Sequence, residues 1–184
     1  MKLKNYILSF NLLKNFLELE IHYGFLELNR KNSFNSYLYG LRNKINIINL
    51  NWTYKSLKQF FFILLYFLKD NKKIIFIGFP NWFNEKWKLL EMISDKNYIF
   101  LEYHWKYKYL RKNRKKIGTI IVFNDYFFLT ELEKLSNQLN IPLIGFSSNN
   151  INTFDYLIPG NFNSQKGVLF LYYFFFNLIR FKYL

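Results

Sequence analysis

The stretch that decides the fold is GTIIVFNDYFFLTELEKLSNQLNIPLIGFS, residues 118–147. It begins with a continuous apolar run at 118–123, continues through a segment of helical length at 128–140, and ends in a second apolar run at 141–147. Continuous apolar strands on either side of a helix are typical of parallel strands that are buried on both faces and joined by a right-handed crossover. The stretch therefore predicts a strand–helix–strand unit of an α/β domain.

The same alternation continues through the chain from residue 45 onward. Strands are predicted at 45–50, 72–80 and 97–103, and helices at 53–71, 84–94 and 164–181. This pattern predicts a doubly wound α/β fold, Rossmann-like or flavodoxin-like, with a mainly parallel sheet and helices on both faces. We expect residues 45–184 to form this single domain. Residues 1–44 are expected to form an N-terminal extension, with a helix near 8–20 followed by a polar, basic segment.

The composition excludes several kinds of chemistry. The 184 residues include no Cys, which rules out a disulfide framework, a thiol nucleophile and a Cys-based zinc site. With His22 and His104 as the only histidines, a His-rich metal site is not expected either. The loop GFPNWFNE at 78–85 has neither the spaced glycines of a dinucleotide site nor a P-loop ending. We therefore expect no metal, no cofactor, no small-molecule substrate and no enzymatic activity.

The charge balance points to a polyanionic partner. A formal net charge of +14 destabilises a compact isolated domain by self-repulsion and favours nucleic acid or an anionic membrane. The longest apolar runs, at 60–68 and 167–179, are shorter than a membrane-spanning helix, so we expect buried core helices and no membrane span. Ala is absent and Phe, Ile, Asn and Lys abound, a bias that fits an A+T-rich genome such as that of an organelle.

The most basic segment is HWKYKYLRKNRKK, residues 104–116. Its Lys and Arg side chains can neutralise phosphates, while its aromatic rings can stack on bases. A solvated loop shaped by codon bias and a nuclear-targeting run are alternative interpretations. A second basic cluster lies in the N-terminal extension, and two separate clusters indicate an extended footprint rather than one pocket. The predicted RNA-binding residues are Arg30, Lys31, Arg42, Lys44, His104, Trp105, Lys106, Lys108, Arg111, Lys112, Arg114, Lys115 and Lys116.

The order of motifs resembles the small-subunit ribosomal protein two family of bacteria and organelles. The family's N-terminal signature is matched by HYG at 22–24, by YGLRN at 39–43 and by IINL at 47–50. Residues 118–179 are similar throughout to its C-terminal half, including DYLIPGN at 155–161. In the family this Pro-Gly-Asn turn joins a short edge strand to the closing helix. Here we expect Gly160 to adopt a conformation that other residues resist, and Asn161 or Asn163 to cap that helix.

One segment departs from the family pattern. Between the third and fourth strands the family usually carries an Arg-Trp-Leu-Gly-Gly motif and a protruding helical hairpin of several dozen residues. Only Trp105 of that motif is clear here, and residues 106–116 lead directly to Gly118. The hairpin is therefore predicted to be deleted, which puts in doubt the contacts that the family makes through it.

The resemblance implies a structural role in translation. It implies a constituent of an organellar small ribosomal subunit that binds small-subunit rRNA and neighbouring ribosomal proteins near the head–body junction. The codon bias favours the mitochondrion, with a plastid-type organelle as the lesser option. A nucleotide-binding α/β enzyme and a peripheral membrane protein are the alternative hypotheses.

Overall fold

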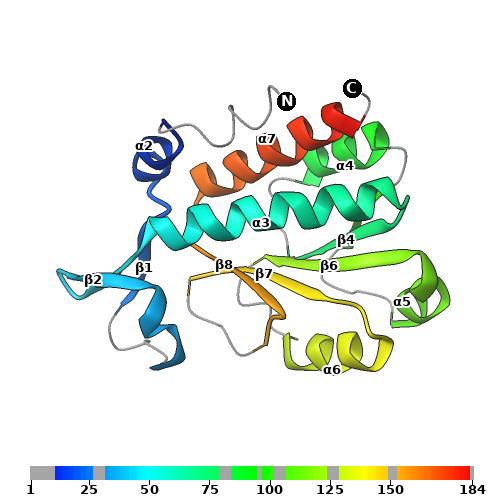
Figure 1. The fold of residues 1–184 in the computed structure, drawn as a ribbon, viewed down its shortest axis with the longest axis horizontal. Helices are drawn as coiled ribbons and strands as arrows, with labels where there is room; N and C mark the ends of the chain where they lie inside the picture. The colour runs from blue at the N-terminus through cyan, green and yellow to red at the C-terminus, as the bar shows by residue number, and fades with distance from the viewer. Residues whose placement is uncertain are drawn as a thin grey trace.

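The computed structural model describes residues 11–26, 32–78, 84–94, 97–101, 107–123, 129–148 and 153–182. These residues contain a five-stranded sheet and a smaller three-stranded sheet. Figure 1 shows the small sheet at one end of the long axis and the short helix α5 at the other.

The five-stranded sheet is parallel throughout, with strand order β5-β4-β6-β7-β8. Its strands are β4 Lys73–Ile77, β5 Tyr98–Leu101, β6 Ile117–Phe123, β7 Leu143–Ser147 and β8 Tyr156–Pro159. The central strand β6 is buried along its whole length, as expected for a strand that is covered on both faces. The predicted doubly wound α/β fold is confirmed.

Helices cover both faces of this sheet. On one face lie α3 Leu50–Lys69, α4 Asn84–Ile93 and α7 Gln165–Lys182 (Figure 1). On the other face lie α5 Tyr107–Asn113 and α6 Leu129–Leu139. Helix α3 begins earlier than predicted because Asn49 caps it, its side-chain oxygen accepting a hydrogen bond from the backbone N–H of Asn51 at 3.0 Å.

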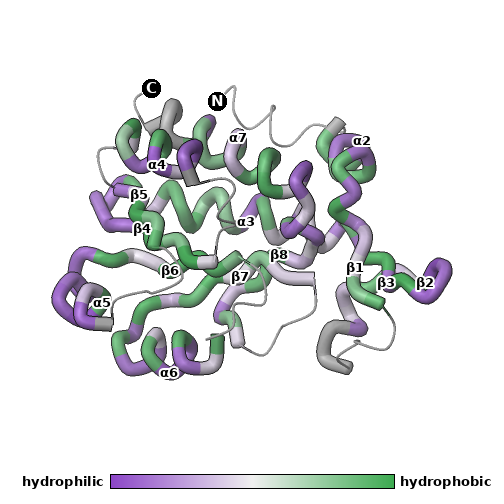
Figure 2. Tube along the Cα trace, turned by 180° about the vertical axis from the view of Figure 1, so that it is seen from behind, coloured by the Kyte–Doolittle hydropathy of each residue, from purple (hydrophilic) through white to green (hydrophobic). Residues whose placement is uncertain are grey.

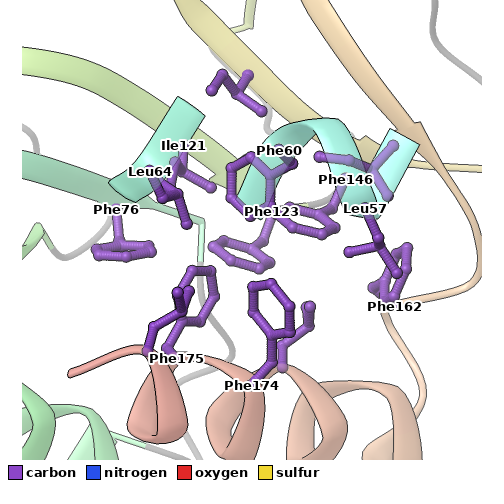
Figure 3. Close-up of a cluster of buried hydrophobic side chains, with 14 of the residues drawn as sticks. Leu57, Phe60, Leu64, Phe76, Ile121, Phe123, Phe146, Phe162, Phe174 and Phe175 are labelled. Carbon is purple, nitrogen blue, oxygen red and sulfur yellow. The ribbon is translucent and has the colours of Figure 1, made fainter. Parts of the chain in front are cut away.

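Phenylalanine fills the core between the sheet and the first group of helices (Figure 3). The rings of Phe123 and Phe146 stack at 5.0 Å between centroids, and Phe175 packs edge-on against Phe76 at 4.9 Å. Burying such a side chain contributes about 1.5–3 kcal/mol, and a favourable aromatic pair adds about 0.5–1.5 kcal/mol. The Phe-rich composition is therefore compatible with a well-packed core.

The N-terminal part forms a helix and an antiparallel sheet. Helix α2 Asn11–Glu18 is followed by strands β1 Tyr23–Leu26, β2 Leu38–Arg42 and β3 Ile45–Ile48, with a 3-10 helix, η2, at Asn32–Tyr37. The strand order is β1-β3-β2. The prediction placed β3 among the parallel strands, and that placement is wrong.

The two-residue turn at Asn43 and Lys44 explains why β3 belongs to the antiparallel sheet. Both residues have positive φ, 49° and 63°, which is the geometry of a tight hairpin and makes β2 and β3 antiparallel neighbours. The turn was missed because it lacks the usual glycine. The predicted domain boundary at residue 45 stays a prediction, although strand pairing joins β3 to β1 and β2 in the preceding segment.

The Pro159-Gly160-Asn161 turn ties the two sheets together. The carbonyl oxygen of Pro159 accepts a hydrogen bond from the buried Thr53 hydroxyl at 2.7 Å. The backbone N–H of Asn161 donates to the carbonyl oxygen of Ile21 at 2.9 Å. The turn therefore joins β8 to α3 and to the chain segment before β1.

Glycine is needed at position 160 for space. A Cβ there would lie 2.5 Å from the Phe162 ring and 2.9 Å from Ile21, whereas among the described glycines only Gly78 has a positive φ. The expectation of an unusual backbone conformation at Gly160 is therefore wrong. The predicted caps are also wrong, because Ser164 accepts the hydrogen bond from the N–H of Gly167 at 3.0 Å, in the first turn of α7.

Candidate nucleic-acid interface

The basic segment after β5 contains a helix, α5, that was not predicted from the sequence. Leu110 is fully buried in the cluster between the sheet and α6, so it holds α5 against the sheet. The Asn113 side chain donates a hydrogen bond to the carbonyl oxygen of Tyr109 at 3.0 Å and closes the last turn. Lys108, Arg111 and Lys112 are exposed.

A short 3-10 helix, η4 Arg114–Lys116, carries the next three basic residues, all of them exposed. The ammonium group of Lys72 donates a hydrogen bond to the carbonyl oxygen of Lys115 at 2.7 Å. In the sheet, Lys73 pairs with Ile117, which directly follows η4. The turn between α3 and β4 therefore lies beside η4.

We call these residues the amino-edge patch, because they gather where β4 and β6 begin. Its members are Lys69, Lys72, Lys73, Lys108, Arg111, Lys112, Arg114, Lys115 and Lys116. Open α/β sheets bind nucleotides at the opposite edge, beyond the carboxyl ends of the strands. The patch is an outward-facing surface suited to neutralising phosphates. It does not lie at the edge of the sheet where a nucleotide pocket would be expected.

Sequence reasoning missed the three lysines from the α3–β4 turn. They lie in the run KDNKK at 69–73, which reads as an ordinary helix end followed by a strand. Only strand register brings them to η4, since β4 and β6 are neighbours in space and far apart in sequence.

The second basic group lies on the hairpin of β2 and β3. Arg42 ends β2 and Lys44 occupies the turn, and both side chains are exposed. Figure 1 shows this hairpin and α5 at opposite ends of the long axis, and Figure 2 shows hydrophilic residues at both places. The basic residues of the amino-edge patch and those of the hairpin thus lie on two separate surfaces.

Five of the predicted RNA-binding residues lie outside the described part of the chain: Arg30, Lys31, His104, Trp105 and Lys106. The structure brings together the six others from the 104–116 segment in the amino-edge patch, and it places Arg42 and Lys44 on the hairpin. Their contact with RNA stays a prediction.

His22 lies beside the small sheet, with its ring 4.2 Å from the ring of Tyr23. Its Nδ1 is buried without a hydrogen-bond partner among the described residues. Burial lowers the pKa of His22, and the smaller effects of Glu20 and Arg42 oppose each other. Its surroundings fit a structural residue that stays neutral.

Metal sites and membrane spans bear on other functions. No group of three His, Cys, Asp or Glu side chains able to hold a metal ion occurs in the described ranges. Within the same part of the chain, no helix has both the length and the apolar character needed to cross a membrane.

Comparison with known proteins identifies the family. An α/β domain that carries basic surfaces at both ends belongs to the class of proteins suited to a polyanionic partner. Residues 16–120 match the family described as Ribosomal protein S2. Since the match covers more than half of the chain, this chain belongs to the ribosomal protein S2 family.

Two bacterial relatives agree with this assignment. The chain is 23% identical over 207 residues to the small ribosomal subunit protein uS2 of Saccharophagus degradans, covering 85% of this chain and 83% of that protein. It is 35% identical over 66 residues to the uS2 protein of Endomicrobium trichonymphae, covering 36% of this chain and 27% of that protein. The first alignment has 207 positions but includes only 85% of this 184-residue chain. Several dozen positions of that alignment therefore have no counterpart in this chain.

Proposed function

We propose that the chain is a structural constituent of a mitochondrial small ribosomal subunit. There it binds small-subunit rRNA and neighbouring ribosomal proteins near the head–body junction and catalyses no reaction. The observation that carries the proposal is the match of residues 16–120 to the ribosomal protein S2 family. Family membership makes it a small-subunit ribosomal protein; the organelle, the rRNA contact and the position in the particle are the proposed part.

The distribution of charge supports the rRNA contact. The chain carries a formal net charge of +14, and its described basic side chains include the amino-edge patch at one end of the molecule and Arg42 and Lys44 at the other. Such a surplus repels itself in the isolated protein and is compensated when phosphates lie against it. The parallel sheet holds the two surfaces apart, so that the protein spans separate RNA segments as a scaffold.

The short connection between β5 and β6 supports an organellar form of the protein. Residues 102–116 link the two strands, and the described part of this link consists of α5 and η4. This link is too short for a helical hairpin of several dozen residues. A similar number of positions in the alignment with the Saccharophagus degradans relative have no counterpart in this chain. Together with the amino-acid bias that fits an A+T-rich genome, the short link favours a reduced, organelle-encoded protein.

Sedimentation of a mitochondrial lysate at moderate salt, with and without RNase, tests the proposal. The protein should move with small-subunit rRNA, and RNase should shift it to slow fractions. Slow sedimentation in both samples would contradict a ribosomal role. Flotation with anionic vesicles that survives RNase would favour the peripheral membrane protein instead, and saturable nucleotide binding would favour the enzyme.

A further inference from the structure

The edge strand β2 contains a bulge that turns one aromatic side chain outward. Leu38 pairs with Ile48 and Gly40 pairs with Ile47, so Tyr39 is an extra residue without a partner on β3. Bulges at sheet edges interrupt the pleat and re-aim side chains. Tyr39 is 82% exposed, more than any other large hydrophobic side chain in the described residues.

The neighbouring Gly40 leaves open space beside this ring. A Cβ built at Gly40 would have no heavy atom within 4 Å, apart from those of Gly40 itself and of its chain neighbours Tyr39 and Leu41. The strand order β1-β3-β2 places both residues on an edge strand that pairs only with β3 among the described residues. A flat aromatic group can therefore approach the strand at Gly40, next to Tyr39, with only the two chain neighbours of Gly40 beside it.

Positive charges follow directly along the same strand. Gly40 and Arg42 are two residues apart along β2 and therefore lie on the same face of the sheet, where they pair with Ile47 and Ile45 of β3. At the rise of a strand, Arg42 lies about 10 Å from Tyr39, within reach of a phosphate next to a base stacked on that ring. Lys44 adds a second cation at the turn. An exposed aromatic ring beside cations is the arrangement that binds unpaired nucleotides.

We propose that Tyr39 and Gly40 form a stacking site for an unpaired RNA base, with Arg42 and Lys44 binding the adjacent phosphates. This inference rests on the proposed function, because it takes RNA as the partner. Duplex RNA cannot use the site, since its bases are already stacked. The hairpin thus recognises a single-stranded or looped segment.

Binding of the full-length protein to a 12-nucleotide single strand and to an RNA duplex of equal charge tests the site. Tyr39→Phe should keep the affinity for the single strand within about twofold. Tyr39→Leu should lower it about 5- to 150-fold, because stacking contributes about 1–3 kcal/mol per base. Duplex binding and the salt dependence should not change. Gly40→Val, which suits a strand but fills the open space, should act like Tyr39→Leu.

The matched control is Tyr66→Leu, which removes another exposed tyrosine, 62% exposed, from the surface of α3. It should leave single-strand binding unchanged. Equal binding by wild type and Tyr39→Leu would overturn the stacking site while leaving the ribosomal role intact if the protein still sediments with small-subunit rRNA. Failure of the wild type to sediment with that rRNA would instead contradict the proposed function.

A photo-crosslinking group at position 39, introduced into assembled small subunits, separates RNA from protein as the occupant. Crosslinks to rRNA at an unpaired nucleotide are expected. Crosslinks to a ribosomal protein alone would overturn the proposal and would indicate that a partner chain adds to the edge strand β2.

Discussion

At the scale of single residues, Tyr98 is a polar group placed where an apolar one would fit better. Its side chain is fully buried, and its hydroxyl has no hydrogen-bond partner among the described residues. Burial raises the pKa of Tyr98 far above its usual value, so the hydroxyl stays protonated. Tyr98→Phe should therefore raise the free energy of unfolding by about 1–2 kcal/mol in urea denaturation, because it removes an unpaired buried hydroxyl.

The control for Tyr98 is Tyr156, whose hydroxyl donates to the carbonyl oxygen of Ser56 at 2.8 Å. Burial raises the pKa of Tyr156 to about 12. Tyr156→Phe should lower the free energy of unfolding by about 1 kcal/mol, because it removes this hydrogen bond. If Tyr98→Phe destabilises the protein as Tyr156→Phe does, the Tyr98 hydroxyl has a partner and the account of this site is wrong.

His22 gives the stability a pH dependence. Because burial lowers its pKa in the folded protein, the unfolded chain binds more protons near and below pH 6.5. The His22 contribution is therefore fully present above pH 6.5 and is lost as the pH falls below it. Urea midpoints at pH 5 and pH 7.5 measure this change, and His22→Gln should reduce the difference. An unchanged difference would assign the pH dependence to other groups.

At the scale of elements, the β2–β3 hairpin combines strain with charge. Lys44 holds a φ of 63°, which a residue with a side chain adopts at a cost of about 1–2 kcal/mol. Lys44→Gly should stabilise the protein by about 1 kcal/mol in urea denaturation, since glycine relieves this strain. It should also weaken RNA binding. Lys44→Gln should weaken RNA binding without the gain in stability. Equal stability of the two variants would contradict the claim that the positive φ of Lys44 is strained.

The amino-edge patch should act through charge. Replacing Lys112, Arg114, Lys115 and Lys116 with glutamine should weaken incorporation into small subunits. It should also reduce the slope of log affinity against log salt by about 3, at about 0.7–0.9 per lost phosphate contact. The control variant Lys58→Gln with Lys134→Gln neutralises exposed lysines on α3 and α6. Normal incorporation of the fourfold variant would exclude this patch as an rRNA contact.

The elements differ in how well the sequence predicts them. The strands and helices of the parallel domain could be predicted because their apolar runs and helical periods are local signals. The helix α5 was missed because only Leu110 marks its buried side among exposed cations. The hairpin was missed because its turn uses Asn43 and Lys44 in place of glycine. The bulge at Tyr39 has no sequence signal, since strand register alone defines it.

At the scale of the whole molecule, the amino-edge patch and the β2–β3 hairpin lie at opposite ends of the long axis (Figure 1). The sequence predicts both clusters but not their separation, which depends on where the antiparallel sheet docks. At this docking site the backbone N–H of Asn161 donates a hydrogen bond to the carbonyl oxygen of Ile21, which directly precedes the antiparallel sheet. Gly160→Ala should therefore lower stability by about 1–3 kcal/mol in urea denaturation, because a Cβ there meets the Phe162 ring and Ile21.

The contrasting variant for the docking turn is Gly40→Ala, because a Cβ at Gly40 has open space around it. It should change the free energy of unfolding by less than about 0.5 kcal/mol, as is usual for surface substitutions. Equal effects of Gly160→Ala and Gly40→Ala would contradict the tight approach at the Pro159-Gly160-Asn161 turn.

The most direct test of the central claim is the amount of this protein in salt-washed small ribosomal subunits purified from mitochondria. Quantitative mass spectrometry against the small-subunit rRNA should give one copy of the protein per rRNA molecule. A small fraction of a copy, or loss of the protein during the salt wash, would contradict its role as a structural constituent of that subunit.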